Sequence, residues 1–381
     1  MSTDQATANL RPAHPEATGA APLVAICILN WNGWQDTLEC LESVRNLSHA
    51  NYLTVVVDNG SLNESLERLR AWGTEHFREQ GTFVEYRRDE ALRGGEAGSE
   101  TRLEQCASNQ RMVLINNEEN LGFNGGCNVV FRYAFRRPQP AEYLFLLNND
   151  AAPDKDCLNQ LIQVHQQAKA GIVGAVIKTR ESGEMFFAGN RGSFPLLREF
   201  FSPLLTWPAV TPDPRKDFEP SFFNHGAGVM IRKDVLEAVR KSTGHYFDEA
   251  YFIYGGDDLD LSEHARKCGY STVIANHALV YHGRASSSGG LSNPIVNYYP
   301  TRNRVRAARK LLPWPWRPFF HVIHISWSTG RASYNLLRGR RRSALAIFRG
   351  LADGYRGVTG KWQYHDEEVQ RWLAHQHGKE A

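Results

Sequence analysis

The stretch Tyr143-Leu144-Phe145-Leu146-Leu147-Asn148-Asn149-Asp150 decides the fold. Five apolar residues are followed abruptly by three short polar ones, a pattern that predicts a fully buried parallel strand whose carboxyl end opens into a crevice. Ligands of open α/β sheets bind at such crevices. Amide and carboxylate oxygens at this position suit Mg²⁺ or Mn²⁺ held jointly with the phosphates of a substrate. A simple polar cap between strand and loop would give the same pattern, so the surrounding sequence has to distinguish the two.

Strand and helix patterns alternate around this stretch. Apolar runs at Leu23–Leu29, Leu53–Val57 and Ile172–Ile177 predict further buried strands, and helical periodicity follows the first two. Ser61, with Glu64 in capping-box spacing, is the predicted N-cap of the second helix. Such βαβ alternation predicts an α/β fold with a mostly parallel sheet. Because no G-x-G-x-x-G fingerprint follows the first strand, the usual dinucleotide-binding fold is excluded.

Composition narrows the class of protein and its surroundings. The 381 residues suffice for one large α/β domain with an appendage. The six cysteines form no CxxC pair and no zinc-type spacing, which indicates thiols in a reducing compartment. No uncharged apolar run reaches the ~18–20 residues of a membrane span. We therefore expect a cytoplasmic protein.

Three regions can be separated along the chain. Residues 1–21 are rich in Ala, Thr and Pro without a continuous apolar run, which predicts a disordered leader. Residues 22–300 carry the α/β pattern, interrupted at about 87–110 by a polar, aperiodic stretch that predicts a surface insertion. Residues 301–381 form a basic, aromatic-rich helical extension. The net charge is only +3, but arginines crowd this last region, which points to an anionic partner.

Eight segments in a fixed order carry a resemblance to a known enzyme family. They are Ile28–Gly33, Val57–Ser61, Asn120–Asn128, Leu147–Asp150, Gly226–Gly228, Asp257–Leu261, His282 and Tyr298–Arg304. The sequence resembles glycosyltransferase family two, and within it the bacterial rhamnosyl- and galactofuranosyltransferases. The resemblance covers about residues 23–306. It implies the nucleotide-sugar-binding GT-A fold, a mostly parallel Rossmann-like sheet flanked by helices, here followed by the C-terminal helical extension.

The resemblance also assigns roles to residues by position. Asp258 is implied to be the catalytic base, and Asp150 and His282 the ligands of Mn²⁺ or Mg²⁺. The implied donor-binding residues are Asn30, Asn32, Asp58, Asn120, Gly122, Phe123, Gly125, Gly126, Asn128, Asn148 and Asn149. The implied acceptor-binding residues are His225, Gly226 and Asp257. Structural alternatives remain open at this point: turn formation by Asp58, a structural His282, and N-capping by the aspartate pair.

The implied reaction is the inverting, metal-dependent transfer of a sugar, rhamnose foremost, from a nucleoside-diphosphate sugar to a hydroxyl of a cell-surface or lipid-linked glycan. A base deprotonates the acceptor hydroxyl and a metal neutralises the departing nucleoside diphosphate. A galactofuranosyltransferase with a uridine-diphosphate donor is the alternative. Proteins of another class, which bind nucleotide sugars, membranes or nucleic acid without catalysis, are a further alternative. The extension has no RNA-binding module signature, so no nucleic-acid partner is expected.

The extension combines apolar helical stripes with positive charge. Trp314, Trp316 and Trp327 lie near a run of arginines at Arg338 to Arg342. This combination predicts an interfacial amphipathic helix on an anionic membrane surface, with the enzyme peripheral on the inner face of the cell membrane. Packing of the helices on the catalytic domain is the alternative. The membrane hypothesis predicts that a chain ending near Lys310 stays folded and binds donor but no longer binds anionic vesicles.

Overall fold

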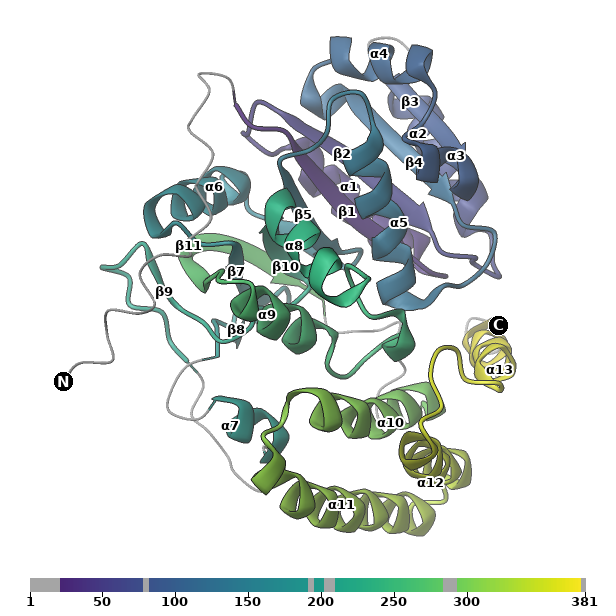
Figure 1. Ribbon diagram of the computed structural model, residues 1–381. Coiled ribbons are helices and arrows are strands. Elements are labelled where there is room, and N and C mark those ends of the chain that lie inside the picture. The colour runs from purple at the N-terminus through teal and green to yellow at the C-terminus, as the bar shows by residue number, and fades with distance from the viewer. Residues whose placement is uncertain (1–20, 78–81, 191–194, 202–209, 284–292, 378–381) are drawn as a thin grey trace, which may run out of the picture.

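The computed structural model describes residues 21–77, 82–190, 195–201, 210–283 and 293–377. A twisted sheet with flanking helices forms the upper part of the molecule in Figure 1, and a group of helices lies beneath it. Residues 1–20 of the expected leader lie outside the described part of the chain.

The sheet is the organising element of the fold. Within the described residues it has eleven strands, in the order β3-β4-β2-β1-β5-β10-β7-β11-β6, with β8 paired to β7 and β9 to β11. The strands are β1 (Val24–Asn30), β2 (Tyr52–Asp58), β3 (Thr82–Arg87), β4 (Arg111–Asn116), β5 (Tyr143–Asn148), β6 (Ala151–Pro153), β7 (Ile172–Thr179), β8 (Met185–Phe187), β9 (Phe218–Pro220), β10 (Gly228–Arg232) and β11 (Thr272–His282). Pairing is parallel from β3 to β5, whereas β10 is antiparallel to both β5 and β7. The predicted α/β class with a mostly parallel sheet is confirmed.

Strand β5 lies near the middle of this sheet, as its sequence predicts. Its five apolar side chains are buried, and it pairs with β1 on one side and β10 on the other. Asn30 at the end of β1 lies opposite Asp58 at the end of β2, and Leu29 lies opposite Asn148. The polar residues that follow the three strands therefore meet at one edge of the sheet.

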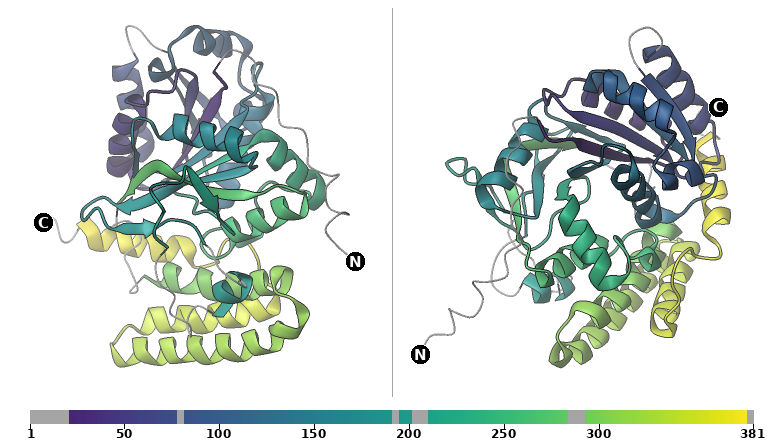
Figure 2. Two further views of the ribbon diagram at one scale, coloured as in Figure 1. Left: turned by 90° about the vertical axis from the view of Figure 1, so that its left-hand side faces the viewer. Right: turned by 45° about the horizontal axis from the view of Figure 1, so that its top comes forward.

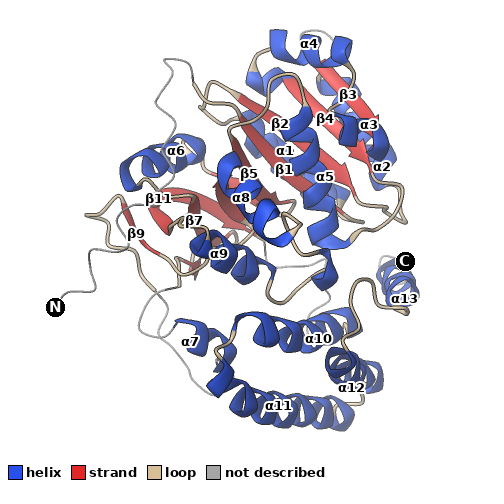
Figure 3. Cartoon of the chain, viewed as in Figure 1, coloured by secondary structure: helices blue, strands red, loops and turns tan. Residues whose placement is uncertain are grey.

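Helices cover both faces of the sheet, because the strand residues alternate between two cores (Figure 3). Ala25 and Cys27 of β1 belong to the core under α5 (Gly122–Arg136) and α8 (Lys233–Thr243). Val24, Ile26 and Ile28 belong to the core on the opposite face. The helices of that face are α1 (Trp34–Arg45), α2 (Ser65–His76) and α6 (Cys157–Ala168).

Two local expectations differ from the structure. Helix α2 begins at Ser65, and Ser61 is not its N-cap, because the Ser61 hydroxyl donates to Asp58 Oδ1 at 2.6 Å instead. The stretch at 87–110 is not a loop but contains α3 (Arg88–Arg93), α4 (Ala97–Gln105) and η1 (Ser108–Gln110).

The C-terminal helices form a second layer. They are α10 (Pro294–Leu311), η4 (Trp314–Trp316), α11 (Arg317–Leu337), α12 (Arg341–Arg356) and α13 (His365–His377). Figures 1 and 2 show α10, α11 and α12 beneath the sheet, with α11 farthest from it. Helix α10 runs through residue 300, where the sequence places the end of the α/β domain, so the helical part begins at Pro294. None of the described helices is long and apolar enough to cross a membrane.

Helix α10 joins the two layers. Its residues Ala307, Ala308 and Leu311 pack with α7 (Pro195–Phe201) and with Phe320 of α11. The helical extension is therefore packed against the α/β part along α10.

Candidate functional site

A pocket of about 450 Å³ opens at the edge of the sheet where β1 and β5 end. Many of the residues implied by the resemblance line it: Asn32, Asn120, Gly122, Phe123, Asn148, Asn149, Asp150, His225, Gly226, Asp257, Asp258 and His282. The fold thus gathers, in one cavity, residues from seven of the eight segments singled out in the sequence; only Tyr298–Arg304 contributes none. Its two ends differ in chemistry and are described in turn.

The first end contains Asp150 and His282. Strand β6 follows Asp150 directly and pairs antiparallel with β11, which places Ala151 opposite His282. As a result, Asp150 Oδ1 lies 3.2 Å from His282 Nε2, and Asn148 Nδ2 lies 3.0 Å from the same nitrogen. Burial raises the pKa of Asp150, and the neighbouring His282 opposes that shift. The two residues, 132 positions apart, are therefore brought together by strand pairing.

The geometry of this pair fits a divalent metal. Neighbouring ligands of an octahedral ion with bonds of about 2.1 Å lie roughly 3.0 Å apart, close to the separation of Asp150 and His282. Among the described residues, no group of three or more His, Cys, Asp or Glu side chains could hold a metal ion. These two side chains could therefore hold a metal only together with oxygens of a bound ligand, for which diphosphate is the natural source.

The aspartate pair lies at the start of α9 (Asp257–Lys267) and faces the same pocket. Burial raises the pKa of Asp257 to about 6, and burial and the neighbouring Asp257 raise the pKa of Asp258 well above its ordinary value. Asp258 Oδ2 accepts a hydrogen bond from the Gly226 backbone at 3.0 Å, which fixes the carboxyl. Gly256 is the N-cap of α9, so neither aspartate has the capping role that the sequence left open. A fixed carboxyl of raised pKa in a pocket has the properties of a general base.

His225 is neutral in this environment. Burial, and the nearby His282, lower the pKa of His225 to about 4. Its Nδ1 accepts a hydrogen bond from the Ala227 backbone at 3.1 Å, so Nε2 carries the proton. The imidazole is thus available as a donor rather than as a base.

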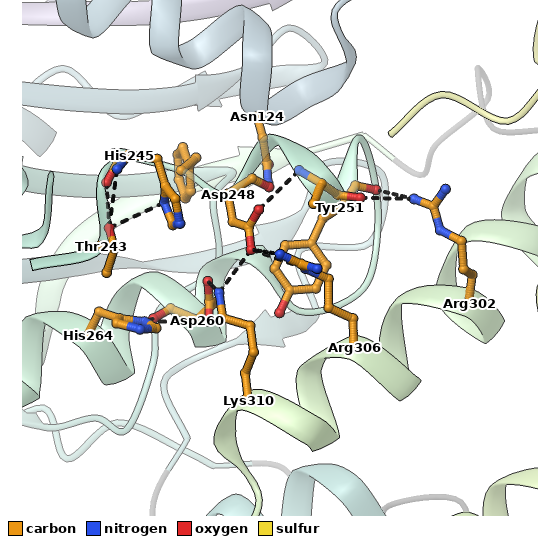
Figure 4. A network of polar contacts seen from close by, with 12 residues as sticks. Asn124, Thr243, His245, Asp248, Tyr251, Asp260, His264, Arg302, Arg306 and Lys310 are labelled. Carbon is orange, nitrogen blue, oxygen red and sulfur yellow. Dashed lines mark hydrogen bonds and ion pairs between the residues drawn. The ribbon is translucent and has the colours of Figure 1, made fainter. Parts of the chain in front are cut away.

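Helix α10 holds the loop that leads into the aspartate pair (Figure 4). Asn303 Nδ2 donates to the backbone oxygens of Tyr251 and Ile253, each at 2.9 Å, and to that of Tyr254. Arg302 donates to the Tyr251 oxygen at 2.9 Å. Phe252 and Tyr254 have φ of 65° and 55°, a backbone conformation that side chains disfavour and that such contacts must maintain.

The same helix neutralises the acid that precedes this loop. Arg306 Nη2 and Lys310 Nζ lie 2.7 and 2.9 Å from Asp248 Oδ2 (Figure 4). Burial tends to raise the pKa of Asp248, but the hydrogen bonds from Lys310 and Arg306 outweigh it and hold this pKa at about 2. The segment Tyr298–Arg304, which the sequence marks only by resemblance, therefore anchors the loop of Tyr251 to Tyr254 that leads into the aspartate pair.

Two of the implied donor-binding residues lie behind the pocket wall rather than on it. Asn30 and Asp58 are buried, and Asn30 Nδ2 donates to Asp58 Oδ1 at 2.8 Å. Ser61 donates to the same carboxylate, and its oxygen accepts from the Asn32 backbone at 2.9 Å. In this structure the two residues therefore support Asn32, which does line the pocket.

Three further implied donor-binding residues, Gly125, Gly126 and Asn128, do not line the pocket either. A Cβ at Gly126 would lie 2.3 Å from Leu29, so this glycine allows α5 to approach β1, and a Cβ at Gly125 would lie 2.8 Å from that of Leu121. Asn128 exchanges hydrogen bonds of 3.0 Å with the backbone of Phe247. Since α5 enters the pocket only with its first turn, the residues beyond Phe123 serve packing.

The second end of the pocket, around Trp31, Asn59 and His365, and the rest of the lining contain residues to which the resemblance assigned no role. They are Leu29, Trp31, Asn59, Ala227, Phe252, Ile253, Tyr254, Gly255, Asn293, Ile295, Val296, His365 and Val369. Leu29, Trp31, Asn59 and Ala227 lie within segments that the resemblance marks, so a signal for them existed. His365 and Val369 belong to α13 and lie beyond the region of resemblance, where the sequence carries no such signal.

Comparisons with known proteins show which family and fold the chain resembles. The family model described as "Glycosyltransferase like family 2" matches residues 100–294. The low-salt glycan biosynthesis hexosyltransferase Agl10 of Haloferax volcanii is 25% identical over 213 residues, which span 56% of this chain and 65% of that relative. The match thus covers slightly less than two thirds of Agl10. The uncharacterized protein Rv1525 of Mycobacterium tuberculosis is 28% identical over 199 residues, 52% of this chain and 67% of its own.

A solved structure shares the fold. The mannosyltransferase PcManGT from Pyrobaculum calidifontis, in complex with GDP-Man and Mn²⁺, superposes with a TM-score of 0.51. The superposition covers 88% of each chain at 14% sequence identity, so the likeness concerns the fold alone.

Proposed function

Because the chain belongs to glycosyltransferase-like family 2, whose model matches residues 100–294, we propose that it is an inverting, metal-dependent glycosyltransferase. Its donor is a nucleoside-diphosphate sugar. The observation that carries the proposal is the meeting of the Asp150–His282 pair and the raised-pKa Asp258 in one pocket. A hexosyltransferase relative and a fold neighbour that holds GDP-Man and Mn²⁺ support it.

The residues divide the reaction between them. Asp258 accepts the proton of the acceptor hydroxyl, whose oxygen forms the new bond to the anomeric carbon while the bond to the diphosphate breaks. The electron pair of that bond leaves with the nucleoside diphosphate, and attack from the opposite face inverts the anomeric centre. Asp150 and His282 would hold Mn²⁺ or Mg²⁺, which neutralises charge on the leaving group. His225 and Gly226, next to Asp258, face the acceptor side.

The resemblance to rhamnosyltransferases leads us to propose rhamnose, carried on a thymidine nucleotide, as the sugar. Galactofuranose on uridine diphosphate is the second candidate. In both cases the acceptor is a hydroxyl of a cell-surface or lipid-linked glycan.

A thermal-shift panel of nucleoside diphosphates and nucleotide sugars, with and without Mn²⁺, tests the proposal. A ligand at about 100 times its Kd stabilises the fold by ~2.7 kcal/mol, which raises the melting temperature measurably. Donors of the correct class should shift the melting temperature more with Mn²⁺ than without. If no nucleotide or nucleotide sugar shifts it with metal present, the proposal is wrong, and a shift without sugar transfer to any glycan would indicate a binding protein.

We also propose that α11 and α12 dock on an anionic membrane. Large apolar side chains are exposed along this part of the chain: Trp314, Trp316, Phe319, Val322, Ile325, Trp327, Tyr334, Leu336, Leu337, Leu345 and Phe348. Isolated exposed apolar residues are ordinary, but such a concentration marks an interaction surface. Arg338, Arg340, Arg341 and Arg342 are exposed beside it. The combination fits an anionic leaflet, at ~1 kcal/mol for each basic residue near the surface.

The structure changes how this docking is best tested. A chain ending near Lys310 would lose α12, which packs along α10, and His365, which lines the pocket. The expectation that such a chain stays folded and binds donor is therefore abandoned. Exposed side chains can instead be changed without touching the core.

Two sets of substitutions separate the contributions to docking. The triple variant Phe319→Ser, Val322→Ser, Ile325→Ser removes apolar contacts, and Arg340→Gln with Arg341→Gln removes charge. Both should abolish co-sedimentation with vesicles of phosphatidylcholine and phosphatidylglycerol, whereas Leu62→Ser, on the α/β part and 51% exposed, should not. If the full-length protein did not co-sediment with such vesicles, membrane docking would be contradicted and a protein partner for this face would be favoured.

A further inference from the structure

We infer that helix α13 forms a wall of the donor site and that His365 is a positioning residue that helps hold the nucleoside there. The inference rests on the proposed function and extends it to the part of the chain that holds the base. It concerns the second end of the pocket, which we call the nucleoside end and define as Trp31, Asn32, Asn59, Asn120 and His365.

The nucleoside end is chemically unlike the first end, with Asp150, Asp258 and His282, which we call the metal end after the ion proposed to bind there. Its residues are amides and aromatic rings, and at neutral pH none of them is charged, because burial lowers the pKa of His365 to about 4. Uncharged rings and amides suit a planar heterocycle with hydrogen-bonding edges, whereas the phosphates belong with Asp150 and His282.

His365 is held in one orientation and one tautomer. Asn120 Oδ1 accepts from the Gly122 backbone at 2.8 Å and from Asn59 Nδ2 at 3.2 Å, so Asn120 Nδ2 must point the other way. It meets His365 Nε2 at 3.3 Å, which makes that nitrogen the acceptor. The proton therefore lies on Nδ1, which donates to the Tyr299 hydroxyl at 3.2 Å. His365 thus fixes the side chain of Asn120, a residue 245 positions earlier.

Contacts with helix α10 hold the start of α13 in place. The Tyr299 hydroxyl also accepts from the Trp362 backbone at 2.9 Å, and the Trp362 ring stacks on Tyr298 with centroids 4.4 Å apart. The His365 ring lies 5.1 Å from Trp31 and 5.3 Å from Phe252. Helix α10 therefore positions both the catalytic loop and the His365 wall.

Two buried donors at this end have no partner. Trp31 Nε1 and Asn32 Nδ2 are buried, and neither has a hydrogen-bond partner among the described residues. Buried N–H groups are costly without an acceptor, so both point to a ligand that supplies two. The base of a nucleotide offers such acceptors on a flat ring: O2 and O4 in uracil and thymine, O6 and N7 in guanine. The nucleoside end therefore suits the base of a nucleoside diphosphate.

Calorimetric titration with UDP, dTDP and GDP in the presence of Mn²⁺ tests the inference. The full-length protein should bind at least one of the three, and the nucleotide that binds most tightly is then used for the variants. His365→Ala should weaken binding of the preferred nucleotide by about 10-fold. His365→Gln keeps an acceptor toward Asn120 and should recover most of that loss, which a purely space-filling residue would not show.

His324→Ala is the matched control. His324 is also a buried imidazole of the helical extension, with its pKa lowered to about 4, and its Nε2 lies 3.0 Å from the Thr301 oxygen, away from the pocket lining. It should leave nucleotide affinity unchanged even where it lowers the melting temperature. Equal affinities of His365→Ala and the unchanged protein would overturn the inference alone. Failure of the unchanged protein to bind any of the three nucleotides would overturn the proposed function as well.

Discussion

The two ends of the pocket are built in different ways. At the metal end, Asp150, Asp258 and His282 are ionisable groups that short sequence segments mark, and strand pairing or one helix turn places each of them. At the nucleoside end, neutral side chains come from the ends of β1 and β2, from the loop after β4, and from α13 near the end of the chain. The difference teaches that each ionisable residue can be recognised from a short sequence segment around it, whereas the proposed nucleoside end depends on the tertiary packing of α13, which no local sequence pattern reveals.

The largest expected effect comes from Asp258 at the metal end. Asp258→Asn keeps the shape of the side chain and removes its proton affinity, so transfer should fall by ~10²–10⁴, the range of general-base catalysis. Nucleotide binding should be retained, and Asp257→Asn should cost less. Steady-state transfer assays with parallel titrations measure both. If Asp257→Asn lowered transfer more than Asp258→Asn did, Asp257 rather than Asp258 would be the base.

The metal ligands should give the next largest effect. Asp150→Ala removes the carboxylate of the Asp150–His282 pair and should lower metal-dependent transfer by about 100-fold, since Lewis-acid stabilisation is worth several kcal/mol. Chelation by EDTA should have the same effect on the unchanged protein and little further effect on the variant. Full turnover of Asp150→Ala at low Mn²⁺ would show that another group holds the metal.

The buried aspartates should make stability depend on pH. Burial raises the pKa of Asp257 to about 6, above the ordinary value of an aspartate, so the folded state binds a proton more tightly than the unfolded state. Stability from this group is therefore fully present below about pH 4 and is lost as pH rises through about 6. Melting curves between pH 4 and 7 should show this dependence flattened in Asp257→Asn. An unchanged profile would mean that Asp257 ionises normally.

The smallest expected effect concerns the anchor shared by both ends. Asn303→Ala removes the hydrogen bonds to the loop of Tyr251 to Tyr254 and should lower stability by about 1–3 kcal/mol and kcat by about 10-fold. Asn276→Ala removes similar bonds, to the oxygens of Asp213 and Lys216, away from the pocket lining. It should lower stability to a similar extent and leave kcat unchanged. Equal kcat values in the two variants would exclude a positioning role for Asn303.

The sequence predicted the parts of the fold in which apolar periodicity is strong. Strand β5 lies where its five apolar residues place it, and the polar residues after it face the pocket. The helices at 87–110 were missed because they are short and bury few apolar side chains, Ala91 and Leu103 among them. Glu100 is fully buried in a pair with Arg137 at 2.9 Å, and the hydroxyls of Tyr86 and Tyr133 donate to it. A buried carboxylate in a short helix leaves no apolar pattern to read.

The nucleoside end could not be predicted for a different reason. His365 and Asn120 are separated by 245 residues, and only the packing of α13 on α10 brings them within 3.3 Å. Asp58 is an example of the opposite error. Its position at the end of a strand suggested that it contacts the ligand, but its carboxylate accepts hydrogen bonds from Asn30 and Ser61 of the protein itself. Position along the chain therefore locates the edge of the sheet, while side-chain partners decide which residues face the ligand.

Nucleotide binding by Asp150→Ala and His365→Ala, each titrated with and without Mn²⁺, tests the division of the pocket most directly. Asp150→Ala should lose the gain in affinity that Mn²⁺ provides while binding the free nucleoside as the unchanged protein does. His365→Ala should bind the nucleoside more weakly while retaining the same relative gain from Mn²⁺. If both variants lost the metal-dependent gain and the nucleoside affinity alike, the two ends would not act as separate sites and the account would be contradicted.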